Sequence, residues 1–198
     1  MSATTRFTVT LAVALLAAAA SSAWAQQAKP PVPAQLVAAG SEIAFVTRQM
    51  GVPVEGRFGK FSAQIALDPK KPETGSVAFT IDTGSARFGA AETDAEVGKP
   101  EWLAVGKFPQ ASFRSSGIKA AGAGKFEVAG KLSIKGQVRD IVVPVQVVQA
   151  GAGSTASGSF TIKRLEFKVG EGDWSDTSMV ANDVQVRFKL ALTGLGAP

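Results

Sequence analysis

The side chains that most enzymes use for acid–base and nucleophilic chemistry are missing from this chain. Its 198 residues include no His, no Cys and no Tyr. The chain therefore has no imidazole base, thiol nucleophile or phenolic acid, which excludes Ser-His-Asp and Cys-His catalysis. A zinc site would also lack its preferred nitrogen and sulfur ligands. We expect no catalytic residues, no metal and no cofactor.

The densest group of carboxylates is formed by Glu171, Asp173 and Asp176 in the segment VGEGDWSDTS. Paired carboxylates can perform acid–base work or hold calcium. The spacing lacks the EF-hand pattern, and Asp and Gly are typical of turns, so we favour a polar turn between two strands. An enzyme that uses these three carboxylates is the competing hypothesis.

The elements that must position any functional residue are predicted to be β-strands. Apolar and polar residues alternate over residues 61–67, 77–82, 126–134 and 184–192, and Gly, Pro and Asp clusters separate such runs. A period of two with frequent turns is typical of an antiparallel all-β protein. The periodicity leaves two architectures open, a sandwich and a closed barrel.

Three segments do not follow the strand pattern. Residues 91–105 begin with acidic residues and are interrupted by Gly98-Lys99-Pro100, which indicates a short helical excursion that caps one end of the fold. The stretches AAGAG, residues 120–124, and AGAGSTASG, residues 150–158, contain only small side chains. We expect both to be surface loops.

The N-terminal segment is predicted to be a signal peptide, residues 1–25. Arg6 provides a positive charge, residues 7–20 form an apolar run, and a small-x-small pattern ends at Ala25. Cleavage after Ala25 and export follow from this pattern, with an uncleaved anchor as the alternative. The Pro-rich residues 26–35 are expected to be a flexible arm ahead of one domain, residues 36–194.

The positive charge of the chain does not indicate a nucleic-acid partner. The formal net charge is +5 and the isoelectric point about 9.6, but Lys and Arg are scattered singly along the sequence. A nucleic-acid-binding protein usually gathers these residues in a basic stripe. Transient contact with an anionic membrane surface is the more consistent consequence. The sequence leaves open whether the chain forms a homodimer.

The aromatic residues are of the type that surrounds a dry space. The chain has 12 Phe and 3 Trp but no Tyr. A Phe ring has no polar group that needs a partner, so it suits either a packed core or an apolar cavity. Composition leaves both alternatives open.

Several motifs resemble the YceI-like family of periplasmic polyisoprenoid-binding proteins. These motifs are MGVPVEGRF at residues 50–58, KFPQASF at 107–113, GKLSIKGQVRD at 130–140 and FTIKRLEFKVGEGDW at 160–174. Their order and spacing extend the resemblance over nearly the whole domain. The chain departs from the family pattern at Gly40-Ser41-Glu42 and in the segment GKPEWLAVG.

The resemblance implies an extended, lipocalin-like antiparallel β-barrel of about eight strands. It also implies a periplasmic, non-catalytic protein whose pore holds an isoprenoid or acyl lipid, such as a polyisoprenoid, an isoprenoid quinone or a fatty-acyl derivative. The alternative is an envelope stress protein that acts through its surface and has a packed interior. We expect eight side chains on or near the pore: Phe45, Met50, Phe58, Phe61, Phe79, Trp102, Phe113 and Trp174. Ordinary core packing is the alternative for each of them.

Overall fold

The structure is a computed structural model that describes residues 33–196. The predicted signal peptide and residues 26–32 lie outside the described residues. The first strand begins at Pro33, so residues 33–35 of the segment expected to be an arm belong to that strand.

The described residues form ten strands, one short α-helix and four 3-10 helices. In chain order the elements are β1 (Pro33–Gln49), β2 (Val52–Phe58), β3 (Phe61–Ala66), η1 (Pro72–Thr74), β4 (Ser76–Asp82), η2 (Thr83–Ser85), β5 (Ala86–Arg87), α1 (Ala91–Glu96), β6 (Gln110–Gly122), β7 (Lys125–Ile134), β8 (Gln137–Ala150), β9 (Gly153–Lys163), η3 (Arg164–Phe167), η4 (Gly172–Ser175) and β10 (Asp183–Thr193).

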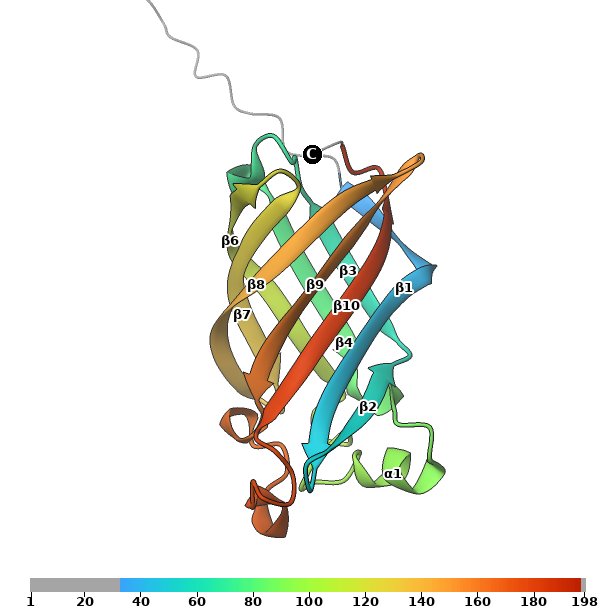
Figure 1. Cartoon of the computed structure of the whole chain (residues 1–198), viewed down its shortest axis with the longest axis vertical. Coiled ribbons are helices and arrows are strands. Elements are labelled where there is room, and N and C mark those ends of the chain that lie inside the picture. The colour runs from blue at the N-terminus through green and yellow to red at the C-terminus, as the bar shows by residue number, and fades with distance from the viewer. Residues whose placement is uncertain (1–32, 197–198) are drawn as a thin grey trace, which may run out of the picture.

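Eight of these strands close into an antiparallel barrel (Figure 1). Neighbouring strands follow the order β10-β9-β8-β7-β6-β4-β3-β1, and β1 pairs with β10 to complete the ring. The closing register places Leu36 opposite Leu192 and Phe45 opposite Val186. The short strand β2 pairs with the second half of β1 and carries β5 on its other edge. The predicted all-β barrel is confirmed, and the sandwich is excluded.

The segments with the clearest alternation of apolar and polar residues form strands at the predicted positions. The patterns over residues 61–67 and 77–82 correspond to β3 and β4, which form a hairpin in which Phe61 pairs with Ile81. The turn between β7 and β8 consists of Lys135 and Gly136, whose φ angles are 48° and 74°. Two positive φ angles in a two-residue turn match the twist of an antiparallel hairpin.

The expectation that residues 150–158 form a surface loop is wrong for most of that segment. Strand β9 begins at Gly153, and Ala156 is buried opposite Leu190 of β10. The other Ala- and Gly-rich stretch is also partly strand, because β6 continues to Gly122. Backbone hydrogen bonds to two neighbouring strands hold β9 in place, and they do not require large side chains.

The two ends of the barrel are built differently (Figure 1). Helix α1, the loop that follows β9 and the β1–β2 hairpin lie at one end, which we call the α1 end. The β3–β4 loop and the C-terminal segment lie at the other end. The expected helical excursion over residues 91–105 is confirmed as α1 and the turns after it. Among residues 33–196, no helix is long and apolar enough to cross a membrane.

Candidate ligand-binding cavity

The interior of the barrel contains an elongated cavity. All eight barrel strands contribute to its lining, which extends from Leu67 and Leu195 at one end to Trp102 and Arg164 at the α1 end. The volume that the centres of water molecules can occupy is about 250 Å³. The total space free of protein atoms is about 1790 Å³ and is partly open to solvent. Of the 36 lining residues, only Thr47, Thr83, Ser112 and Arg164 are polar. The cavity therefore suits an apolar molecule.

Two phenylalanine rings lie along the wall of this cavity because each packs over a glycine on the neighbouring strand. Phe45 pairs across β1 and β2 with Gly56, and a Cβ atom on Gly56 would overlap the Phe45 ring. Phe188 and Gly158 have the same relationship across β10 and β9. Each ring thus occupies the space that a side chain on the next strand would take. This arrangement lines the barrel with aromatic surface and leaves the lumen hollow.

Five of the eight predicted pore residues line the cavity: Phe45, Phe58, Phe79, Trp102 and Phe113. Phe61 does not line this cavity; it borders a second pocket formed by β1, β3, β4 and β6 and packs against the buried core. Met50 lies at the tip of the β1–β2 hairpin with 77% of its surface exposed. The Trp174 ring does not line the cavity, but its centroid lies 5.3 Å from that of Trp102. Contact of any of these side chains with a lipid stays a prediction.

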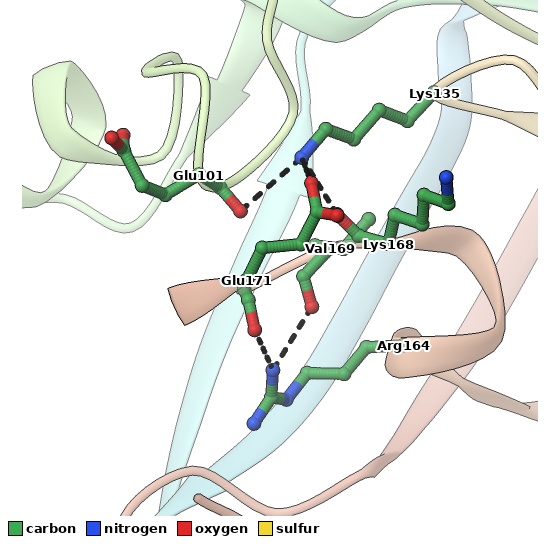
Figure 2. A network of polar contacts seen from close by, with 7 residues as sticks. Glu101, Lys135, Arg164, Lys168, Val169 and Glu171 are labelled. Carbon is green, nitrogen blue, oxygen red and sulfur yellow. Dashed lines mark hydrogen bonds and ion pairs between the residues drawn. The ribbon is translucent and has the colours of Figure 1, made fainter. Parts of the chain in front are cut away.

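Arg164 anchors the loop at the α1 end although only 2% of its surface is exposed. Its five N–H groups donate hydrogen bonds to the carbonyl oxygens of Val169, Gly170, Trp174, Val180 and Ala181 (Figure 2 draws the first two). Burial lowers the pKa of this guanidinium. Among residues 33–196 no carboxylate lies within 4.0 Å of it. Five carbonyl dipoles therefore stabilise this buried charge at the end of the cavity.

Lys135 joins three segments next to Arg164 (Figure 2). Its Nζ donates hydrogen bonds to the carbonyl oxygens of Glu101 and Lys168, at 3.3 and 2.6 Å, and to Glu171 Oε2 at 2.8 Å. The hydrogen bond and positive charge of Lys135 hold the pKa of Glu171 below its ordinary value. The ammonium group is buried, whereas about half of the Glu171 side chain is exposed. This ion pair connects the β7–β8 turn to the loop after η3.

The geometry of the acidic segment fits a turn. Glu171 forms the ion pair with Lys135, and Asp176 Oδ1 accepts hydrogen bonds from the backbone N–H and the hydroxyl of Ser178. These two bonds lower the pKa of Asp176. No group of three acidic side chains within residues 33–196 is arranged to hold a metal ion. The side-chain contacts of Glu171 and Asp176 therefore stabilise this loop.

The profile of the YceI-like domain family matches residues 35–192. The chain belongs to the YceI-like family. This result confirms the resemblance seen in the motifs. A UPF0312 protein of Vibrio cholerae serotype O1 is 31% identical to this YceI-like chain over 134 residues, which cover 66% of this chain and 71% of that protein.

Solved structures contain the same YceI-like barrel. Burkholderia cenocepacia BcnA is 44% identical, with a TM-score of 0.77 over 79% of this chain and 99% of that chain. A polyisoprenoid binding domain from Saccharophagus degradans, implicated in plant cell wall breakdown, is 17% identical, with a TM-score of 0.65 over 86% of this chain and all of that chain. The second similarity shows a common fold alone.

Several residues that line the YceI-like cavity were missed by the sequence reasoning. Phe188 of β10 and Phe160 of β9 are examples, and both lie in runs of alternating apolar residues that gave a usable signal. Phe88 follows β5 and lies 5.2 Å from Phe45 between ring centroids, but no periodic pattern surrounds it. Thr47 and Arg164 are polar, so a search for apolar pore residues passes over them.

Proposed function

We propose that this YceI-like chain is a non-catalytic periplasmic protein that binds one long apolar lipid in its barrel. The ligand classes are a polyisoprenoid, an isoprenoid quinone or a fatty-acyl derivative. The observation that carries this proposal is the elongated cavity, whose wall consists almost entirely of apolar side chains. Carriage or storage of the lipid in the envelope follows as its role.

Burial of the hydrocarbon chain supplies enough free energy for useful affinity. Each methylene group removed from water contributes about 0.8 kcal/mol, so about ten buried groups contribute about 8 kcal/mol before ordering costs. That value corresponds to a dissociation constant near 1 μM in order of magnitude. The binding needs few polar contacts, which agrees with the small number of polar side chains on the wall.

Two further observations support the proposal. The predicted signal peptide supports export, and the scattered positive charge favours transient contact with anionic membranes, from which a lipid would be taken or to which it would be returned. A solved structural neighbour is described as a polyisoprenoid binding domain. The alternative, an envelope stress protein that acts through its surface, required a packed interior, and the cavity does not fit that requirement.

Native mass spectrometry of protein purified from envelope extracts tests the proposal directly. We expect a mass adduct that organic solvent extracts and that is identified as a prenyl or acyl lipid. The delipidated protein should then bind a fluorescent prenyl or acyl probe. A protein that is consistently empty and that also binds no such probe would overturn the proposal.

A variant that fills the lumen tests where the lipid binds. Ala156 lines the cavity from β9, whereas Ser159 of the same strand is exposed. We expect A156F to place a ring in the lumen and reduce probe affinity by about tenfold or more, since it removes space for two or more methylene groups. The S159F variant adds the same ring to the outside and should bind like wild type. Equal binding by both variants would place the ligand outside the barrel.

A further inference from the structure

Two buried polar atoms in the described part of the chain have no hydrogen-bond partner. They are Thr47 Oγ1 and Trp102 Nε1. Folded proteins pair about 90% or more of their buried polar groups, so an unpaired one calls for an explanation. Both side chains line the same apolar cavity, and only 9% of the surface of Thr47 is exposed. A polar ligand group inside the cavity would explain both atoms together.

A series of contacts places both residues at the α1 end. The carbonyl oxygen of Arg48, next to Thr47, accepts a 2.8 Å hydrogen bond from the Ala181 N–H. The carbonyl oxygen of Ala181 in turn accepts a 3.0 Å bond from Arg164 Nε. The guanidinium carbon of Arg164 lies 5.9 Å from the centroid of the Trp102 ring. The two unpaired atoms therefore belong to one region of the cavity.

The chemistry of these groups selects a hydrogen-bond acceptor. The indole N–H of Trp102 can only donate, and the hydroxyl of Thr47 can donate as well. Arg164 has no N–H left to offer, but its positive charge, without a carboxylate within 4.0 Å among the described residues, favours an electron-rich oxygen nearby. A bare hydrocarbon would leave both donors unpaired.

We propose that Thr47 Oγ1 and Trp102 Nε1 form a polar subsite that binds an acceptor oxygen, of the carbonyl type, at the head of the lipid. The hydrocarbon chain then extends along the barrel toward Leu67 and Leu195, where the cavity lining ends. This inference rests on the proposed function and adds to it the class of head group and the orientation of the ligand.

The test compares two ligands that differ only in the head group. Delipidated mature protein is titrated with farnesylacetone, an isoprenoid ketone, and with the isoprenoid alkene of the same chain length. Wild type should bind the ketone about 5- to 30-fold more tightly, the range expected when buried donors gain a partner. T47V and W102F should each lose part of this preference, measured as the ratio of ketone affinity to alkene affinity in the same variant.

Two controls separate recognition from a structural role. T47V replaces an unpaired hydroxyl with a methyl group of the same shape, so the thermal midpoint of the ligand-free variant should not fall below that of wild type. T161V makes the same change at an exposed position of β9 and should alter neither affinity.

Each outcome gives a distinct answer. Equal affinity of wild type for ketone and alkene, or variants that weaken both ligands equally, would overturn the subsite while leaving the binding function intact. Failure of wild type to bind either ligand would overturn the proposed function itself.

Discussion

The ring of Phe45 lies against Gly56, its partner across β1 and β2, so closely that a Cβ atom on Gly56 would overlap it. The ring also contacts Phe58, at 5.1 Å between centroids. The Phe45 ring therefore lies along the wall of the barrel. In most protein cores an aromatic ring would instead fill the centre. The hollow interior depends on this relationship and on its counterpart between Phe188 and Gly158.

Replacement of Gly56 by Ala should push the Phe45 ring into the lumen. Overpacking of this type costs about 1–3 kcal/mol of folding free energy. We expect G56A to unfold at lower temperature and to bind an acyl or prenyl probe more weakly than wild type, as measured by calorimetry and probe titration. The double variant G56A/F45L should recover binding, because the smaller side chain vacates the space.

A matched control for this substitution is G117A in β6. A Cβ atom there meets no atom within 4 Å. This variant should behave like wild type in both assays. Wild-type affinity in G56A would show that the Phe45 ring does not limit the lumen.

Loss of the Arg164 side chain should loosen the α1 end. R164M leaves five carbonyl oxygens without their donor, and we expect a loss of about 3 kcal/mol or more in unfolding free energy. Hydrogen exchange should rise first in residues 169–181. R164K retains the positive charge but has fewer N–H donors, so its unfolding free energy should lie between those of wild type and R164M. R114M, at an exposed position of β6, is the control; an R164M protein as stable as R114M would refute the anchoring role.

The ion pair between Lys135 and Glu171 should contribute to stability only above acid pH. Lys135 depresses the folded-state pKa of Glu171, so the folded state favours the ionised carboxylate. Its contribution is present above the unfolded pKa of about 4.3 and is lost as pH falls through the lower folded value. Because Glu171 is half exposed, we expect only about 0.5–1 kcal/mol between wild type and E171Q at neutral pH.

Urea unfolding of both proteins at pH 7 and pH 2.5 measures this difference without added salt that would screen the pair. The two curves should converge at the lower pH. E42Q changes an exposed carboxylate that forms no ion pair among the described residues and serves as the control. A gap between wild type and E171Q that persists at pH 2.5 would argue against a charge effect.

The β1–β2 turn should be easy to stabilise. Met50 has a φ of 49° and Gly51 a φ of 82°, the geometry in which Asn-Gly is preferred. Met in this left-handed region is strained, so M50N should raise the unfolding free energy by about 0.5–1 kcal/mol. M179N removes another exposed Met that does not have a positive φ and should bring no such gain. Chemical denaturation of both variants measures this difference. A denaturation midpoint of M50N equal to that of wild type would show that Met50 does not strain the turn.

The strands that could be predicted from sequence are those whose large apolar residues alternate. Strand β10 is the clearest, with Val184, Val186 and Phe188 on the cavity side. Strand β9 escaped prediction over residues 153–158 because its side chains there are small, and its position is fixed by backbone bonds to β8 and β10. Small side chains that face inward also leave the lumen wide. The small size of these side chains therefore explains both the weak strand pattern in the sequence and the open space inside the barrel.

The polar residues of the cavity could not be predicted for a different reason. Thr47 is buried because β1 turns its side chain inward within a closed ring, and Arg164 because a loop folds back over its guanidinium. Neither fact has a local pattern in the sequence, since both depend on how distant segments meet. Large aromatic residues such as Phe45 and Phe79 were predictable because their size alone favours the interior.

The barrel is sealed by its first and last strands. The hydrogen bond from the Ala191 N–H to Ser41 Oγ joins residues 150 positions apart, so closure must wait until nearly the whole chain is available. Unless β1 and β10 are paired, the apolar face that lines the lumen is open along that edge of the sheet. A hydrocarbon that is present during folding can therefore enter from the side, between β1 and β10, and does not have to enter through one end of the barrel. We expect chains refolded in the presence of lipid to bind it faster than folded, empty barrels do.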